Sequence, residues 1–322
     1  MEPTPPSPDG SSWFVPFEPE LPVIDSTAVR GAAATADTQS RLSAPSISRA
    51  AARLSPEIVS FYSDRCDEAT RLTSTVKGRL EDLRMRELLE RFLPSPPAQV
   101  ADIGGGTGVH ASWLQRRGYT VELLDPIERH VDQAITSGVP ALVGDARHLP
   151  WRSETFDVAL LAGPLYHLPQ APDRRLALRE SVRVLRPGGM LVAIAINRAA
   201  NLIGATIANT LLARMPVVSE ILERGHSPGN DRLPDGYYHT LTQLRSELAG
   251  VGLTSIVVRG LTGPGSWLGV LINAHYGESE LPATVAEPDP LQTALASARL
   301  ADRSPELAVA SSVLFAVAKK PT

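Results

Sequence analysis

The sequence has little of what disulfides, metal sites and nucleic-acid binding require. Cys66 is the only cysteine among 322 residues, which excludes an internal disulfide and any cysteine-based metal cluster. The net charge is −4 at pH 7, so the chain lacks the basic surplus that accompanies nucleic-acid substrates. No clustering of His, Asp and Glu indicates a metal site either. We therefore expect a globular protein that uses no metal and no nucleic acid.

The N-terminal segment, residues 1–54, lacks the composition of a folded unit. Seven prolines fall in the first 22 residues, and Ala, Ser and Thr dominate the stretch that follows. We expect a loosely ordered arm, whose Trp13, Phe14 and Phe17 either cover the folded body or a ligand, or lie on a disordered tail. The arm has no positively charged start followed by an apolar stretch, so we expect no secretory signal, a cytoplasmic location and no membrane partner.

The most informative stretch is residues 100–108, an apolar strand that runs into a glycine-rich turn and then into a helix. Gly104, Gly106 and Gly108 place no side chain between backbone and ligand, so the turn can bend sharply and present its N–H groups. A dinucleotide fingerprint needs a glycine at position 109, which is Val. A triphosphate loop needs Lys followed by Ser or Thr after its last glycine, where Val and His stand instead. The turn therefore predicts a different cofactor.

An acid at the strand end, Asp102, followed by G-x-G-x-G resembles the first motif of the class I S-adenosylmethionine-dependent methyltransferases. Later segments resemble the next landmarks of this family in the same order. These segments are a strand at 119–124 ending in Asp125, the stretch 141–150 with Asp145, a strand at 156–161, and the turn 184–189 before a strand at 190–196. The resemblance covers roughly residues 56–319 and is closest from 99 to 197.

The resemblance implies S-adenosylmethionine as cofactor and S-adenosylhomocysteine as product. Asp102 suits a ligand with an ammonium group, Asp125 can accept both ribose hydroxyls, and Asp145 can receive the adenine amino group. Phe61, Tyr62, Arg71 and Arg79 are candidates for the cofactor carboxylate or the substrate, or else packing and surface residues. The predicted cofactor-binding residues are Tyr62, Arg79, Asp102, Gly104, Gly105, Gly106, Gly108, Asp125, Pro126, Gly144, Asp145, Ala146, Arg147, Ala162 and Gly163.

Strand and helix patterns alternate from residue 99 to 197, which predicts right-handed crossovers and a parallel sheet covered by helices on both faces. Together with the resemblance, this gives an α/β, Rossmann-like fold with a seven-stranded, mostly parallel sheet and an antiparallel last strand. Within the domain at 55–322 we expect a helical cap at 55–97, with helices at 55–69 and 78–92, followed by the cofactor-binding core at 98–197. An acceptor lid should follow at 198–240, helical at 199–213 and a loop at 215–238. The last expected part is an insertion at 260–310, with a helix at 291–300, before the last strand. The insertion either completes the acceptor pocket or forms a homodimer contact.

The sequence indicates the residues that contact the acceptor less clearly than those that bind the cofactor. Methyl transfer is an in-line displacement that depends mainly on positioning, and a general base helps when the acceptor must lose a proton. In this fold the end of the fourth strand faces the methyl group, so His167 and Tyr166 are the leading catalytic candidates, followed by His226, Tyr238 and His239 in the predicted lid. The alternative for His167 is a packing or capping role. We interpret His110, His130 and His148 as structural and leave His275 unassigned.

The absence of one motif limits the class of acceptor that we expect. Relatives that methylate exocyclic amines of bases, or protein glutamine, have Asn or Asp before Pro-Pro-Tyr at this strand end, and residues 163–166 here read Gly-Pro-Leu-Tyr. The sequence therefore favours a methyltransferase acting on an O, N or C nucleophile of a small molecule, such as a specialised metabolite. The alternatives are a cofactor-binding protein with another role, such as a sensor or a cyclase, and a protein or tRNA methyltransferase.

Overall fold

A seven-stranded sheet carries the site. The computed structural model describes residues 58, 60–62, 68–229, 234–277 and 282–322, all of which belong to one unit, Thr35–Thr322. The sheet has the order β3-β2-β1-β4-β5-β9-β8. Its strands are β1 (Gln99–Ile103), β2 (Thr120–Asp125), β3 (Ala141–Val143), β4 (Phe156–Leu161), β5 (Leu185–Ile196), β8 (Thr254–Gly260) and β9 (Val313–Lys319).

The strand directions confirm the predicted topology. β1, β2, β3, β4 and β5 pair in parallel, whereas β9 lies antiparallel between β5 and β8. The order reverses at β1, from which the chain proceeds first to β2 on one side and later to β4 on the other. Ligands bind at such a switch point, beyond the carboxyl ends of the strands.

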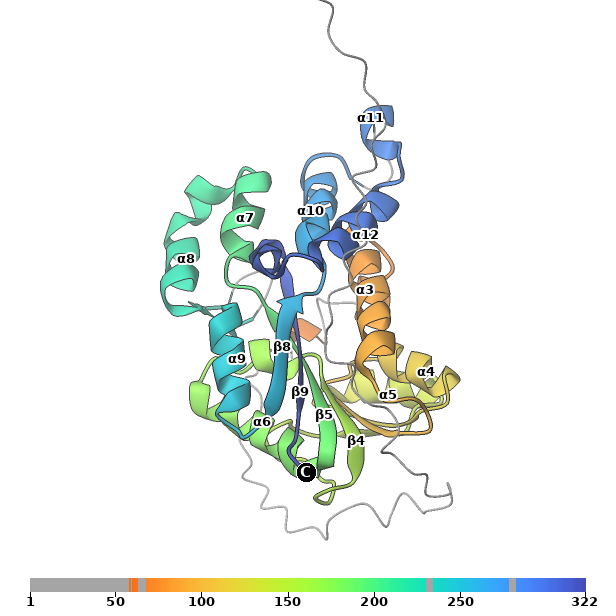
Figure 1. Ribbon diagram of the computed structural model, residues 1–322. Coiled ribbons are helices and arrows are strands. Elements are labelled where there is room, and N and C mark those ends of the chain that lie inside the picture. The colour runs from red at the N-terminus through yellow and green to blue at the C-terminus, as the bar shows by residue number, and fades with distance from the viewer. Residues whose placement is uncertain (1–57, 59, 63–67, 230–233, 278–281) are drawn as a thin grey trace, which may run out of the picture. The chain divides into compact units, whose positions relative to one another are not determined.

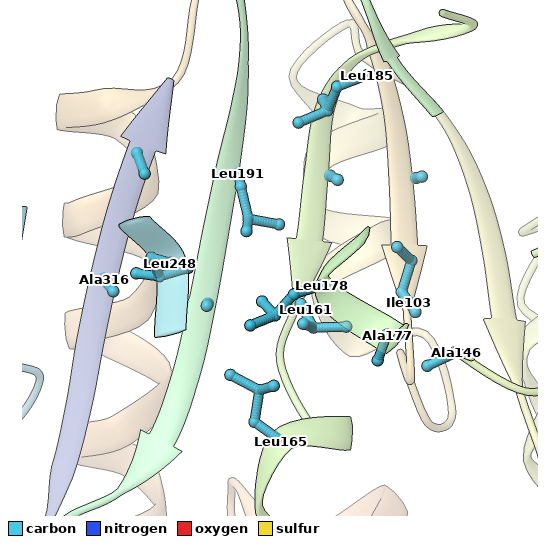
Figure 2. Packing of buried hydrophobic residues seen from close by; sticks show 14 of the residues in the cluster. Ile103, Ala146, Leu161, Leu165, Ala177, Leu178, Leu185, Leu191, Leu248 and Ala316 are labelled. Carbon is cyan, nitrogen blue, oxygen red and sulfur yellow. The ribbon is translucent and has the colours of Figure 1, made fainter. Parts of the chain in front are cut away.

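Both faces of the sheet are buried, which explains why the central strands read as continuous apolar runs. In β5, Leu191, Ala193 and Ala195 point to one hydrophobic cluster, while Met190, Val192 and Ile194 point to the other. Figure 2 shows the first cluster, in which Leu161 of β4 and Leu191 of β5 lie close to helix residues such as Leu178 and Leu248. Alternating side chains on every strand thus attach a layer of helices to each face.

The helices divide between these two faces. α6 (Ala171–Val184) and α9 (Leu241–Ala249) contribute to the first cluster. α3 (Val76–Phe92), α4 (Val109–Arg116) and α5 (Glu128–Thr136) contribute to the second. Local signals fix two of the helix starts: Thr75 caps α3 by accepting the Gly78 N–H, and Thr240 forms a capping box with Gln243 at α9. The sequence predicted the first of these helices, at 78–92.

The remaining elements gather beyond the carboxyl end of β8, as Figure 1 shows for α7, α8, α10 and α12. They are α2 (Glu68–Arg71), α7 (Ala200–Ile207), α8 (Leu211–Arg224), the ribbon β6 (His226–Ser227) with β7 (Gly236–Tyr237), α10 (Ser266–His275), α11 (Ala283–Ala286) and α12 (Pro290–Ala301). α3 packs against α10 and α12, and α7 packs against both α8 and α10. Within the described residues, no helix is both long and apolar enough to span a membrane.

Two predictions need correction or lie outside the structure. The predicted loop at 215–238 is wrong over its first part, because α8 continues to Arg224 in spite of Pro216. The buried side chains of Val218 and Ile221 anchor the helix beyond that proline, so tertiary packing outweighs the missing N–H. The predicted arm at 1–54 and most of the predicted helix at 55–69 lie outside the described residues.

Candidate active site

The glycine-rich turn between β1 and α4 has the backbone that its sequence predicts. Gly104, Gly106 and Gly108 have φ angles of 73°, 57° and 81°, in the left-handed region that glycine adopts without strain. The turn is tied to β2, because the Gly104 N–H donates to the Leu124 carbonyl at 2.7 Å and the Gly106 N–H donates to Asp125 Oδ2 at 2.9 Å. The first acid, the turn and the second acid therefore form one connected unit.

Asp102 is buried without a hydrogen-bond partner. Its side chain lies under the glycine turn, and a Cβ placed on Gly105 would come within 2.5 Å of Asp102 Oδ2. Neither carboxylate oxygen has a hydrogen-bond partner in the structure. Burial, and after it the charge of Asp125, raises the pKa of Asp102 to about 7. An unpartnered buried carboxylate is costly, so this position favours a ligand that brings a positive charge.

Asp125, at the end of β2, organises the residues around it. Oδ1 accepts the Ile127 N–H at 3.0 Å and lies 3.2 Å from His130 Nδ1, while Oδ2 accepts the Gly106 N–H. A carboxylate has about four acceptor positions, so these three partners leave capacity for a hydroxyl group. Asp125 therefore both shapes the turn and keeps part of its acceptor capacity.

Asp145, which follows β3, forms a fork-shaped ion pair with Arg147. Arg147 donates from Nε at 3.0 Å and from Nη2 at 2.6 Å, and its backbone N–H donates to Asp145 Oδ1 at 2.8 Å. Hydrogen bonding to Asp145 raises the pKa of Arg147 further above its ordinary range. Arg147 also contacts Asp173 at 3.1 Å, so its guanidinium lies between two carboxylates, one of which is Asp145.

These acids meet in a first cavity at the carboxyl ends of β1, β2 and β4. The predicted cofactor residues that line it are Tyr62, Asp102, Gly104, Gly105, Gly106, Asp125, Pro126, Asp145, Ala146, Ala162 and Gly163. The predicted residues that do not line it are Arg79, Gly108, Gly144 and Arg147. Arg79 is exposed on α3, whereas Arg147 is buried and forms an ion pair with Asp145.

The polar atoms of the first cavity indicate a ligand site. Both oxygens of Asp102, Nδ1 of His110, Nε2 of His130 and Nδ1 of His167 are buried without hydrogen-bond partners, and all four residues line this cavity. Buried polar groups are normally satisfied, so unsatisfied ones at a single place call for a partner that the protein itself does not supply. A ligand with donors and a positive charge fits this set of atoms.

Three aromatic residues stand at one wall of the cavity. The Tyr62 hydroxyl and His167 Nε2 are hydrogen-bonded at 2.7 Å, and the Tyr166 ring lies 4.5 Å from the His167 ring. Tyr62 also contacts the His130 ring edge-on, at 5.7 Å between ring centroids. Burial lowers the pKa of His167 to about 3, so its imidazole is neutral near physiological pH.

A second cavity of about 430 Å³ adjoins the first. The residues that line both are Tyr62, Arg71, Leu72, His110, Ala162 and Tyr166. The rest of its lining comes mainly from α3, β5, α7, α8 and α10, including Trp267 of the predicted insertion and Asn201 and Arg214 of the predicted lid. Its size is that of a small-molecule pocket. The structure thus contains two adjoining cavities with a common wall.

Comparison with known proteins identifies a methyltransferase domain. The sequence model of a methyltransferase domain matches residues 101–193, which contain the glycine turn and all three acids. The match supports a class I S-adenosylmethionine-dependent methyltransferase. The chain is a methyltransferase enzyme, and the predicted fold class is confirmed by the sheet order.

Relatives of this methyltransferase include two curated bacterial enzymes named demethylmenaquinone methyltransferase. The one from Mycolicibacterium paratuberculosis is 28% identical over 228 residues, covering 67% of this chain and 94% of the relative. The one from Corynebacterium kroppenstedtii is 27% identical over 202 residues, covering 62% and 83%. Among solved structures, a methyltransferase from Methanosarcina mazei has 16% identity and a TM-score of 0.49, covering 73% of this chain and 97% of its own.

Only some of the predicted catalytic residues of this methyltransferase line the two cavities. Tyr166 lines both cavities, His167 lines the first and Tyr238 lines the second. His226 lines neither and contacts Asp235 at 2.6 Å in the ribbon formed by β6 and β7. His239 also lines neither, because it is fully buried and contacts Glu247 at 3.2 Å.

Two histidines that we interpreted as structural line the first cavity of the methyltransferase, His110 and His130. Burial, followed by the charges of Arg71 and Arg86, lowers the pKa of His110 to about 4. Each residue stands in the first turn of a helix that begins directly after the glycine turn or after Asp125. That placement was a signal in the sequence, since the first turn of such a helix borders the ligand site.

Proposed function

We propose that this methyltransferase transfers the methyl group of S-adenosylmethionine to an O, N or C nucleophile of a small molecule that binds in the second cavity. The observation that carries the proposal is the arrangement of two cavities with a common wall, the first containing unsatisfied buried polar atoms. A cofactor and an acceptor can then meet at Tyr62, Ala162 and Tyr166, which face both spaces.

The residues of the first cavity fit S-adenosylmethionine. Asp102 has an unpartnered carboxylate for the ammonium group, Asp125 has acceptor capacity for the ribose, and Asp145 and Ala146 line the region expected for adenine. When bound, the cofactor supplies a methyl group on a positively charged sulfur. The turn requires glycine at positions 104 and 105, because a Cβ there would meet Pro164 or Asp102.

Tyr62 is the residue of this wall best placed to hold the acceptor by a hydrogen bond. Its hydroxyl is hydrogen-bonded to His167, which does not line the second cavity, whereas Tyr62 does. We assign Tyr62 as the group that contacts the acceptor and His167 as the residue that positions it. His167 is held neutral by burial and can accept a hydrogen bond at one ring nitrogen only in that state.

The size and lining of the second cavity support a small acceptor rather than a macromolecule. Trp267, Ile194 and Val313 provide an apolar surface for a ring or a short chain. The curated relatives are named for demethylmenaquinone, which is also a small molecule. Their sequence identity is too low to transfer that acceptor to this chain.

Calorimetric titration with S-adenosylmethionine, S-adenosylhomocysteine and NADH tests the first half of the proposal. We expect micromolar binding of the two sulfur ligands and none of NADH. Asp125→Ala should weaken S-adenosylhomocysteine binding at least about tenfold, since two hydrogen bonds worth about 1 kcal/mol each are lost. Equal affinity of wild type and variant would refute the assignment of the site.

An acceptor screen tests the second half. Formation of S-adenosylhomocysteine that depends on an added small molecule supports methyl transfer. Turnover of a small molecule without S-adenosylhomocysteine formation would favour the alternative of a cyclase-like reaction on a bound cofactor. Methylation of protein or tRNA alone would contradict the small-molecule assignment.

A further inference from the structure

Arg214 of α8 lines the second cavity and has no carboxylate partner among the residues that the structure describes. Within the described part of the chain, its one hydrogen bond runs from Nη2 to Asn201 Oδ1, a neutral group, at 3.4 Å. The other two cationic side chains of this cavity, Arg71 and Lys77, both contact Glu81. Arg214 therefore differs from Arg71 and Lys77, because its hydrogen-bond partner is neutral and theirs is acidic.

Two further polar side chains lie beside Arg214. Asn201 of α7 and Tyr238, which follows β7, also line the second cavity. Burial raises the pKa of the Tyr238 hydroxyl, which is surrounded by Asn201, Arg214 and Ser227, so this hydroxyl keeps its proton. Arg214, Asn201 and Tyr238 can each donate a hydrogen bond, and they come from three separate elements.

The charges of the described lining residues favour a negatively charged ligand. Glu81 is the only acidic side chain that lines the second cavity among them, against Arg71, Lys77 and Arg214. A half-buried cation without an acidic partner loses hydration without a compensating ion pair. A ligand anion would compensate it, and the planar guanidinium of Arg suits a carboxylate or phosphate better than any other side chain does.

The rest of the cavity is apolar. Trp267 and Val270 of α10, Ile194 and Ile196 of β5 and Leu261 provide this surface. We propose that the acceptor is a small amphipathic molecule with one anionic group, a carboxylate or a phosphate, that binds Arg214, Asn201 and Tyr238, while its apolar part lies against Trp267. This inference rests on the proposed function, since it takes the second cavity as the acceptor site.

Three probes of one size test the inference by calorimetry in the presence of S-adenosylhomocysteine. They are 2-naphthoate, 2-naphthyl phosphate and the neutral 2-naphthalenemethanol. We expect at least one of the two anions to bind wild type about tenfold more tightly than the alcohol, because a hydrogen-bonded ion pair is worth more than a neutral hydrogen bond. The stronger of the two anions identifies the group as a carboxylate or a phosphate.

Variants assign the preference to Arg214. Arg214→Gln should abolish the difference between anion and alcohol and leave S-adenosylhomocysteine affinity unchanged. The matched control is Arg224→Gln, on the same helix, where the arginine side chain is 73% exposed and pairs with Glu220. This control should keep the full preference.

The wild-type comparison also holds if Arg214→Gln does not fold. Equal binding of all three probes, no binding of either anion at millimolar concentration, or a preference that survives in a folded Arg214→Gln variant would each overturn the inference. These results differ from failure of the proposed function, which would appear as loss of S-adenosylhomocysteine binding to the wild-type protein itself.

Discussion

The hydroxyl of Tyr62 lies 2.7 Å from Nε2 of His167, although 105 residues separate the two in the chain. Their rings meet edge-on with centroids 5.3 Å apart. The contact closes one wall of the first cavity, and Tyr62 extends from there to the second. It places a phenol, next to a neutral imidazole, where the first and second cavities adjoin.

Tyr62→Phe is expected to slow methyl transfer, because the acceptor loses the hydroxyl group that would orient it. The loss should be about a hundredfold in kcat, the size expected when a reacting group is misplaced by about 1 Å, with S-adenosylhomocysteine affinity changed little. The rate of S-adenosylhomocysteine formation measures it. Tyr119→Phe is the matched control, because its hydroxyl donates to the Pro94 carbonyl far from either cavity lining. Equal kcat for both variants would remove Tyr62 from the mechanism.

His167 is expected to stay neutral at acidic pH, because burial lowers its pKa to about 3 from the ordinary value of 6.5. Between these values the folded state binds fewer protons than the unfolded chain, so stability is lost as pH falls through 6.5 towards 3. Nitrogen-15 chemical shifts of the imidazole, assigned with the His167→Gln variant, should show no titration near 6.5. A midpoint at the ordinary value would show that the ring is hydrated.

Asp102→Asn is expected to stabilise the ligand-free protein at alkaline pH and to weaken cofactor binding. Because burial raises its pKa from 3.8 to about 7, the folded state holds an extra proton in that range, and stability is lost as pH rises through it. Thermal unfolding should therefore give the variant a higher Tm at about pH 8 and a smaller advantage at about pH 5. S-adenosylhomocysteine affinity should fall about tenfold.

The control for this prediction is Asp132→Asn, on the exposed side of α5. It should show neither the pH-dependent gain in Tm nor the loss of affinity. If Asp102→Asn lowers the Tm at alkaline pH, the wild-type carboxylate has a favourable partner after all, and the ammonium assignment loses its physical basis.

Gly104→Ala should destabilise the protein more than Gly138→Ala does. Both glycines have positive φ angles, 73° and 83°, so either substitution strains the backbone by about 1 kcal/mol. Only at Gly104 would the new Cβ meet a rigid neighbour, 2.7 Å from Pro164 Cδ, whereas nothing lies within 4 Å at Gly138. The difference in free energy of unfolding between the variants isolates the steric part. S-adenosylhomocysteine binding should fall only for Gly104→Ala. Equal decreases in the free energy of unfolding for both variants would mean that the turn can shift to accommodate the new Cβ.

Glu247→Gln should lower stability at neutral pH by about 3 kcal/mol, since it breaks a largely buried ion pair with Arg174 and leaves that cation uncompensated. Burial opposes ionisation of Glu247, but bonds from His239 and Arg174 outweigh it and hold its pKa at about 2. The stabilisation is present above the ordinary value of 4.5 and is lost as pH falls through 4.5 towards 2. Urea unfolding at several pH values should show wild type and variant converging in acid. Glu220→Gln, in an exposed pair with Arg224, should change stability little at any pH.

Local sequence determined the frame of this methyltransferase. Continuous apolar runs specify strands that are buried on both faces, and the glycines at 104, 106 and 108 specify the turn after β1. The convergence of Asp102, Asp125 and Asp145 followed as well, because parallel neighbours end at the same edge of a sheet. These features depend on periodicity and backbone conformation, which a short stretch of chain expresses by itself.

Tertiary structure alone decided the partners of the polar side chains. His239 and Arg147 looked like site residues, yet neither lines the first cavity, because His239 is buried against Glu247 and Arg147 against Asp145, while His110 and His130 do line it. Helix α8 continues through Pro216 because side chains beyond the proline are buried. The charge state and contacts of such residues depend on desolvation and on segments distant in the chain. No local pattern contains that information, so only the folded structure joins Tyr62 to His167 and places Arg214 in the second cavity.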